Sequence, residues 1–162
     1  MVGGLTAKAA LRDEVLSQLK GDLDVLNRAQ ASAREAATHE EAKPENDKDT
    51  RALEASYLAR GQSLRIEELK LGVAEVEALR LRAFESGAPA ALGALIEAQE
   101  AGVSLCFFLI PSGGGKRVGE GAVQVVTPKS PLGQALLGMR EGDDCELLLA
   151  GKTRALSISR VW

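Results

Sequence analysis

The chain has few aromatic residues, few cysteines and a single histidine, and each shortage excludes a class of site. Aromatic residues make up 3% of the 162 residues, which leaves little surface for stacking bases or enclosing a ligand. Two cysteines form no disulfide framework, so we expect a reduced, cytoplasmic compartment. One histidine argues against a histidine-rich metal site. No apolar run approaches the roughly 20 residues of a membrane span, and no signal-peptide core is evident, so we expect no membrane contact.

An excess of positive charge is also missing. The formal net charge is −3 and the isoelectric point is near 5.3. A sequence-specific DNA-binding surface needs a basic stripe, and none is evident here. We therefore expect no direct, sequence-specific binding to DNA.

The two halves of the chain differ in composition. Residues 1–85 are rich in Ala, Leu, Glu and Arg, which favour helices, and contain one proline. Residues 86–162 contain the other four prolines and most of the glycines, between short apolar runs. The sequence therefore predicts an α+β protein with a helical domain over 1–85 and a small sheet domain over 86–162.

Two heptad series in the first half follow the alternating three–four spacing of a coiled-coil seam. They are Leu16, Leu19, Leu23, Leu26, Gln30, Ala33, Ala37 and Ala55, Ala59, Gln62, Ile66, Leu69, Val73, Val76. Paired in reverse order, from Leu16 with Val76 to Ala37 with Ala55, they share one register centred on residue 46. This predicts an antiparallel hairpin in which Gln30 faces Gln62, and its internal pairing predicts a monomer.

The predicted turn of the hairpin is acidic. Pro44 disfavours helix at the residue before it and interrupts the hydrogen-bond ladder. Residues 40–49 have a net charge of −3, from two lysines and five acids: Glu40, Glu41, Glu45, Asp47 and Asp49. At about 1.5 Å per residue, helices of about 30 residues would give an arm of roughly 45 Å with this cluster at its far end. A hard cation such as Mg²⁺ takes carboxylate oxygens as ligands, so a few such acids can recruit it.

In the second half, strand-type runs cover residues 103–110, 122–127, 145–149 and 155–161, and residues 92–98 could add another. Residues 130–138 carry helix signals: Ser130 suits the N-cap, Pro131 the first helical position and Gly138 the position after the end. We expect a small antiparallel sheet with one short helix.

Residues 130–138, Ser-Pro-Leu-Gly-Gln-Ala-Leu-Leu-Gly, followed by Gly142 and Asp143, resemble the C-terminal signature of the bacterial Gre transcript-cleavage factors, the GreA/GreB family of transcription elongation factors. Pro44-Glu45-Asn46, between two long helices, resembles the acidic hairpin tip of that family. The resemblance implies an FKBP-like sheet domain after the hairpin and covers nearly the whole chain.

This resemblance also implies a mechanism. The sheet domain would dock on RNA polymerase, with Ser130, Pro131, Leu132 and Gly133 as the docking residues. The hairpin would enter the secondary channel, where its tip helps hold Mg²⁺ beside the 3′ end of a backtracked nascent RNA. The chain would then stimulate the polymerase's own cleavage activity and would not itself be an enzyme.

The tip departs from the family pattern, which has an acid three residues before the glutamate; here Ala42 occupies that position. By this resemblance Glu45 would keep its role, Glu41 would take that of the missing acid, and Asp47 would be a further metal ligand. The departure leaves open a second reading, a non-cleaving regulator or inhibitor that occupies the secondary channel. A peptidyl-prolyl isomerase is disfavoured because its pocket needs several aromatics, and a plain coiled-coil adaptor leaves the tip and the signature unexplained.

Overall fold

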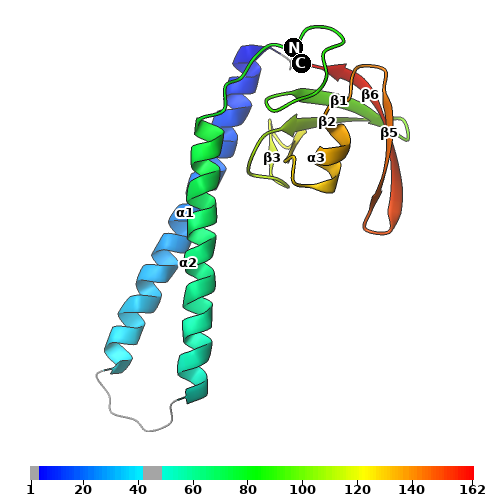
Figure 1. The fold of residues 1–162 in the computed structure, drawn as a ribbon. Helices are drawn as coiled ribbons and strands as arrows, with labels where there is room; N and C mark the ends of the chain where they lie inside the picture. The colour runs from blue at the N-terminus through cyan, green and yellow to red at the C-terminus, as the bar shows by residue number, and fades with distance from the viewer. Residues whose placement is uncertain (1–3, 42–48) are drawn as a thin grey trace.

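The computed structural model describes residues 4–41 and 49–162 (Figure 1). Its first half is a helical hairpin of α1 (Leu5–Glu41) and α2 (Asp49–Glu77), and its second half is a six-stranded sheet with one short helix. This confirms the predicted α+β class and the order of its parts. The boundary predicted at 85/86 falls between the end of α2 and the first strand and stays a prediction. Among the described helices, none combines the length and hydropathy needed to cross a membrane.

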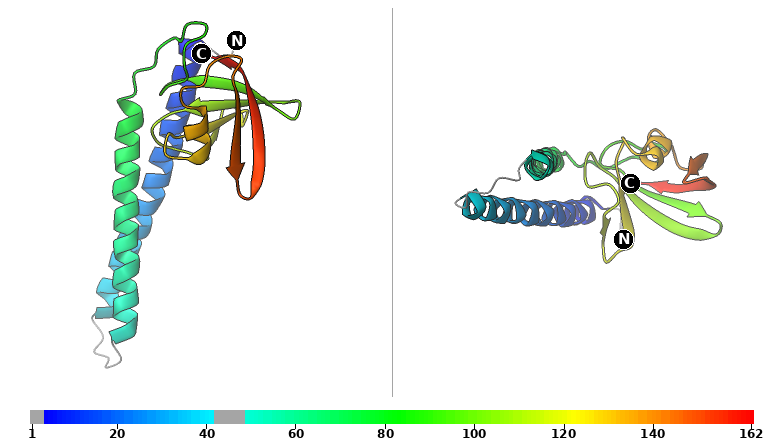
Figure 2. Two further views of the ribbon diagram at one scale, coloured as in Figure 1. Left: turned by 45° about the vertical axis from the view of Figure 1, so that its right-hand side comes forward. Right: turned by 90° about the horizontal axis from the view of Figure 1, so that it is seen from below.

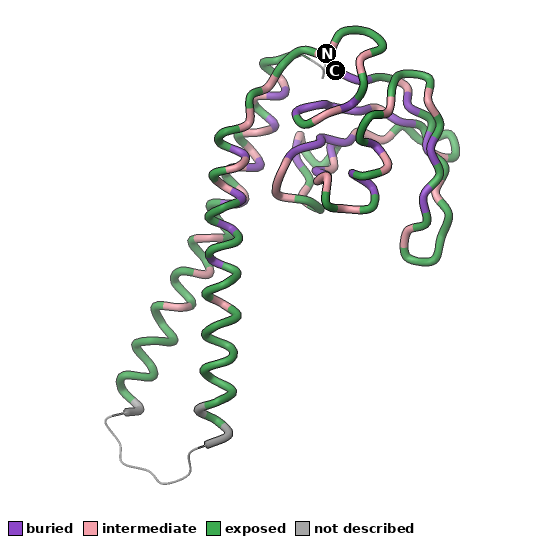
Figure 3. The backbone as a smooth tube through the Cα atoms, viewed as in Figure 1, coloured by how far each residue is buried: buried purple, intermediate pink, exposed green. Residues whose placement is uncertain are grey.

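The hairpin is packed closely only in the half nearest the sheet. Its buried seam residues include Leu19, Ile66, Leu69 and Val76, all at most 6% exposed. Toward the far end the seam residues are alanines, and residues 31–39 of α1 are all exposed (Figure 3). Because alanine side chains are short, the two helices have less to bury against each other there.

The sheet has the strand order β3-β4-β2-β1-β6-β5. Its strands are β1 (Leu95–Glu100), β2 (Val103–Leu109), β3 (Arg117–Val118), β4 (Val123–Val126), β5 (Asp144–Leu149) and β6 (Lys152–Val161). The four predicted strand runs and the possible fifth all appear, while β3 was not predicted. A two-residue turn with positive φ at Ala150 (51°) and Gly151 (77°) joins β5 to β6, as the right-handed twist of a hairpin favours.

One strand pair corrects the expectation of an antiparallel sheet: β2 and β4 run parallel. The short strand β3 lies outside β4 at the edge of the sheet and pairs with it antiparallel. The chain leaves β2, turns back through β3 and turns again, so β4 enters beside β2 in the same direction. The reversal depends on a two-residue strand in a glycine-rich segment, which is too short to give a period-two signal.

Both faces of the sheet are covered. Successive residues of β2 point to opposite faces, so this strand contributes side chains to two separate cores. Phe107 and Leu109 belong to the core under α3 (Pro131–Leu136), which contributes Leu132 and Leu136. The other face of the sheet packs against the hairpin. The core between them includes, from α1, Leu11, Val15 and Leu19 and, from the sheet domain, Phe108, Ile110, Val118, Val123 and Val125. The first half of α1 is therefore part of the sheet domain's core, and the arm continues past the sheet from this base (Figure 2).

Candidate functional site

The predicted metal ligands lie, in the sequence, at the end of α1 and between α1 and α2. α1 ends at Glu41 and α2 begins at Asp49, whereas Glu45 and Asp47 lie outside the described residues, as does the side chain of Glu41. The metal assignment therefore stays a prediction from the sequence. In the part of the chain that the structure describes, no group of three or more His, Cys, Asp or Glu side chains could hold a metal ion.

The base of the arm is fixed to the edge of the sheet by one face of α1. The N–H of Gly119 donates to Glu14 Oε2 at 2.8 Å, and Gln18 Nε2 donates to the carbonyl oxygen of Arg117 at 2.9 Å. One turn further along, Lys116 Nζ lies 2.5 Å from Asp22 Oδ2. Residues four apart share a helix face, so these contacts form one continuous attachment to the segment around β3.

Beyond Asp22 the arm stands free of the sheet domain (Figure 1). Residues 23–41 of α1 correspond to roughly 28 Å of helix at about 1.5 Å per residue. The attachments around β3 therefore fix the base of α1, while the outer part of this helix extends beyond the sheet domain.

A second attachment is made by Lys8, whose side chain is fully buried. Its Nζ donates to the main-chain oxygens of Arg82 at 2.5 Å, Gly93 at 3.0 Å and Trp162 at 3.0 Å. It also lies 4.7 Å from the centre of the Phe84 ring. Burial, with the positive charge of Arg82, lowers the pKa of Lys8 from 10.5 to about 8. One side chain thus joins α1, the segment after α2 and the end of β6.

A groove lies between the two helices in the outer part of the arm, with a volume of about 410 Å³. Four alanines that were predicted as seam pairs line it: Ala33, Ala37, Ala55 and Ala59. At its inner end Gln30 Nε2 donates to Ser63 Oγ at 2.9 Å, so Gln30 bonds to the neighbour of its predicted partner Gln62. We call this space, lined by the four alanines together with Gln30, Arg34, Leu58, Arg60, Gln62 and Ser63, the distal groove.

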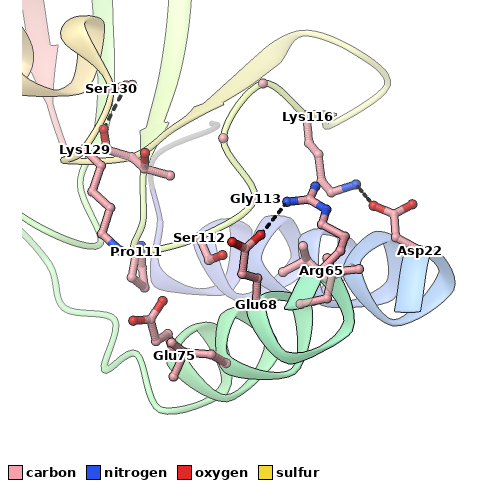
Figure 4. A pocket seen from close by; sticks show the side chains of 16 residues that line it. Asp22, Arg65, Glu68, Glu75, Pro111, Ser112, Gly113, Lys116, Lys129 and Ser130 are labelled. Carbon is pink, nitrogen blue, oxygen red and sulfur yellow. Dashed lines mark hydrogen bonds and ion pairs between the residues drawn. The ribbon is translucent and has the colours of Figure 1, made fainter. Parts of the chain in front are cut away.

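A larger cleft of about 800 Å³ lies between the hairpin and the sheet domain (Figure 4). Its lining includes three basic and three acidic side chains: Arg65, Lys116, Lys129, Asp22, Glu68 and Glu75. Two ion pairs cross or border it, Lys116 with Asp22 at 2.5 Å and Arg65 with Glu68 at 3.2 Å. The cleft is therefore close to neutral, and its charge selects no particular class of ligand.

The predicted docking loop has a structural role of its own. Ser130 is the N-cap of α3: its Oγ accepts from the N–H of Gly133 at 3.0 Å and donates to the carbonyl oxygen of Thr127 at 2.8 Å. Leu132 and Gly133 are buried, whereas Pro131 is exposed and Ser130 lines the large cleft. Of the four residues predicted to dock, Ser130 and Pro131 therefore offer surface to a partner, and the docking role stays a prediction.

Sequence reasoning missed Lys8 and the distal groove. Lysine is rarely buried, but Lys8, Leu11, Val15 and Leu19 follow a three–four–four spacing that marks one helix face. That spacing could have placed Lys8 in an interface. The sequence also indicated the groove, because alanines replace large residues at four successive seam positions.

A scan of the sequence against protein-family models gave no match, and neither did a search of curated proteins. Among solved structures, the chain is similar to the GreA factor homolog 1 (Gfh1) protein of Thermus thermophilus, with 19% identity, a TM-score of 0.40 and coverage of 91% of this chain and 94% of that chain. Thermus aquaticus Gfh1 gives 17% identity and a TM-score of 0.41, with coverage of 90% and 92%.

The prokaryotic transcription elongation factor GreA/GreB from Nitrosomonas europaea is also similar, with 17% identity and a TM-score of 0.39 over 57% of this chain and 78% of that chain. Identities of 17–19% and TM-scores near 0.4 are too low to carry an argument about function. They assign no role to any residue.

Proposed function

We propose that this protein is a transcription elongation factor that binds RNA polymerase, inserts its hairpin into the secondary channel and stimulates Mg²⁺-dependent cleavage of backtracked RNA. Its partners would be the polymerase and, inside it, the 3′ end of the nascent RNA. The protein would act as a monomer in the cytoplasm. The cleavage reaction would belong to the polymerase active site, so the chain would not be an enzyme by itself.

The free outer part of the arm carries this proposal. A hairpin fixed at its base by Lys8 and by the Glu14–Asp22 face of α1 can keep its direction while its end enters a channel. The side chains of residues 31–39 are exposed, and no described element of the sheet domain covers them. The acidic turn predicted from the sequence would be the first part of the chain to reach the bottom of such a channel.

The tip acids would act on a metal shared with the polymerase. Glu45 and Glu41 would hold Mg²⁺ from one side, with Asp47 as a further ligand, because carboxylate oxygens are what this ion prefers. When bound, the ion would activate a water for in-line attack on the phosphodiester. The part of this chain is to place its carboxylates at the RNA 3′ end, while Ser130 and Pro131 contact the rim of the channel.

A transcript-cleavage assay on a backtracked elongation complex tests this proposal. We expect the wild-type chain to release a short 3′ fragment in Mg²⁺ buffer, and Glu45→Ala and Glu41→Ala to reduce the rate. Glu35→Ala is the matched control, because Glu35 is exposed on α1 below the tip and should leave the rate unchanged. Equal rates for the Glu45 variant, the Glu35 variant and the wild type would refute the role of the tip.

A second candidate function is a secondary-channel regulator that binds polymerase without cleavage. Ala42 favours it, since an alanine stands where the resembled family has an acid. In that case the wild type would bind the elongation complex and alter its activity, but no shortened RNA would appear. Ala42→Asp would then be expected to restore cleavage.

A further inference from the structure

The outer part of the arm leaves large apolar side chains exposed to solvent. Leu53, Tyr57 and Leu58 of α2 are 57%, 73% and 67% exposed, while the seam between the helices is built from alanines. Fully burying a side chain as large as leucine stabilises a protein by about 1.5–3 kcal/mol. A hairpin that stayed exposed to water would be more stable with these large side chains in the seam between the helices. We infer that a partner covers this part of the hairpin.

The distal groove adds a shape to this apolar surface. It extends from Ala37 and Ala55 near the tip to Gln30 and Ser63, and four of its described lining residues are alanines. Gln30 and Ala37 are seven positions apart on α1, which corresponds to about 10 Å or two helical turns. Leu58 lines the same groove and is largely exposed, so its side chain can contact whatever lies there.

The charge of the groove restricts its occupant. Among the described residues that line it, the charged ones are Arg34 and Arg60. Within residues 4–41 and 49–162, neither of them forms an ion pair with a described side chain. Two arginines beside these alanines complement an apolar segment with carboxylates along its side, because arginine pairs with carboxylate in a bidentate manner.

We propose that the distal groove binds about two turns of an amphipathic helix of RNA polymerase, whose aliphatic side chains contact the alanines and whose carboxylates pair with Arg34 and Arg60. This inference rests on the proposed function and adds a contact that is separate from the acidic tip. Helix-in-groove recognition buries the apolar face of a helix at three–four spacing, and a helix lying along the groove would cover the surface that the alanines leave exposed. The contact would hold the arm in the channel whether or not cleavage occurs.

Filling the groove with the chain's own side chains tests the proposal. The double variant Ala33→Leu/Ala59→Leu places two large side chains in the groove, and Ala36→Leu makes the same exchange at an exposed position of α1 outside the groove. Equilibrium binding of each labelled full-length chain to core RNA polymerase is measured without nucleic acid. We expect the double variant to bind at least about tenfold more weakly, the size of a hot-spot loss. The Ala36 variant should bind like the wild type.

Reversing the charge of the two arginines is an independent test. Arg34→Glu/Arg60→Glu should weaken binding by about tenfold or more, because it sets like charges against the partner's carboxylates. Arg28→Glu is the control: Arg28 is exposed on α1 and lies outside the groove. Circular dichroism of all variants checks that the helices remain folded.

The outcomes separate the two proposals. If the wild type binds polymerase and the groove variants bind equally well, the groove inference is wrong while the proposed function stands. If the wild type does not bind polymerase, both are wrong. Should the losses occur only with elongation complexes that contain RNA, and not with core polymerase, the groove contacts nucleic acid and the helix proposal is overturned.

Discussion

Gly133 is the position at which the Ser130–Gly138 segment can be tested most sharply for a structural role. It is the third residue of α3, and it lies against the end of β4. A Cβ added there would stand 1.9 Å from the carbonyl oxygen of Thr127 and 2.6 Å from its carbon. Real Cβ atoms essentially never come within 3.0 Å of another heavy atom. Since the obstacle is backbone, no side-chain rotation relieves it, and Gly133→Ala must push α3 away from the sheet.

The size of the effect follows from what α3 holds in place. A shift of about 1 Å strains a core packed as densely as a crystal, and overpacking of this kind costs about 1–3 kcal/mol. The same shift weakens the hydrogen bond from the Gly133 N–H to Ser130 Oγ, a helix cap worth about 1 kcal/mol. We expect a total loss of about 2–4 kcal/mol, which lowers the melting temperature by roughly 5–15 °C in a protein of this size.

Thermal unfolding followed by the fluorescence of Trp162, the only tryptophan, measures this loss, since Trp162 packs against the core between the sheet and the hairpin. Gly61→Ala is the matched control. Gly61 lies inside α2 with nothing within 4 Å of an added Cβ, so the same exchange should stabilise the arm by about 0.5–1 kcal/mol. Melting of Gly133→Ala within error of the wild type would refute the close approach of α3 to Thr127.

Four further predictions concern charge and capping. Because the pKa of Lys8 is lowered to about 8, the unfolded chain binds more protons than the folded chain above that pH, so stability should rise by about 1 kcal/mol from pH 8 to pH 9. Lys8→Met should remove this rise in urea titrations. Burial raises the pKa of Cys106 to about 11. Because the unfolded thiol loses its proton at lower pH than the folded one, Cys106 should lower stability only above pH 9. The hydrogen bond from Arg154 lowers the pKa of Glu100. This pair should therefore stabilise the chain above pH 4.5 and cease to do so in acid. A double-mutant cycle that gave no coupling at pH 7 would contradict this. Ser130→Ala should cost about 1 kcal/mol through loss of the cap, and an unchanged urea midpoint would count against it.

The local elements could be predicted because their signals are local. A three–four spacing of apolar residues is enough for α1 and α2, and the alternation along β6 is enough for a strand. The short helix α3 was predicted from its ends: Ser130 is its cap, and Gly138 has the positive φ of 83° that favours glycine after a helix. Each of these features depends on residues a few positions apart.

The packing of α1 on the sheet could not be predicted in the same way. Leu11 and Val15 show an apolar helix face, but nothing in their spacing says whether it meets α2 or a strand 100 residues later. The structure places them against Val118 and Val123. The parallel pairing of β2 with β4 was missed for a similar reason, since it depends on the path of the chain through a two-residue strand.

At the distal groove the heptad spacing predicted which residues face each other but not the space between them. The seam series continues through Ala33 and Ala59, and these residues do face one shared space. However, the alanines leave a groove of about 410 Å³ between the helices there, because short side chains at a helix contact fill little space. The acidic tip itself stays a prediction, as Glu45 and Asp47 lie outside the described residues.

The central claim is that the end of the arm enters the polymerase, and photo-crosslinking tests it most directly. A photoreactive residue is placed at Ala36, exposed near the tip, or at Leu148, exposed on β5 of the sheet domain, and each full-length chain is bound to a backtracked elongation complex. We predict that the Ala36 probe crosslinks to the polymerase beside its active site or to the RNA 3′ end, and that the Leu148 probe reaches neither. Crosslinks to the active-site region from Leu148 but not from Ala36 would contradict insertion of the arm.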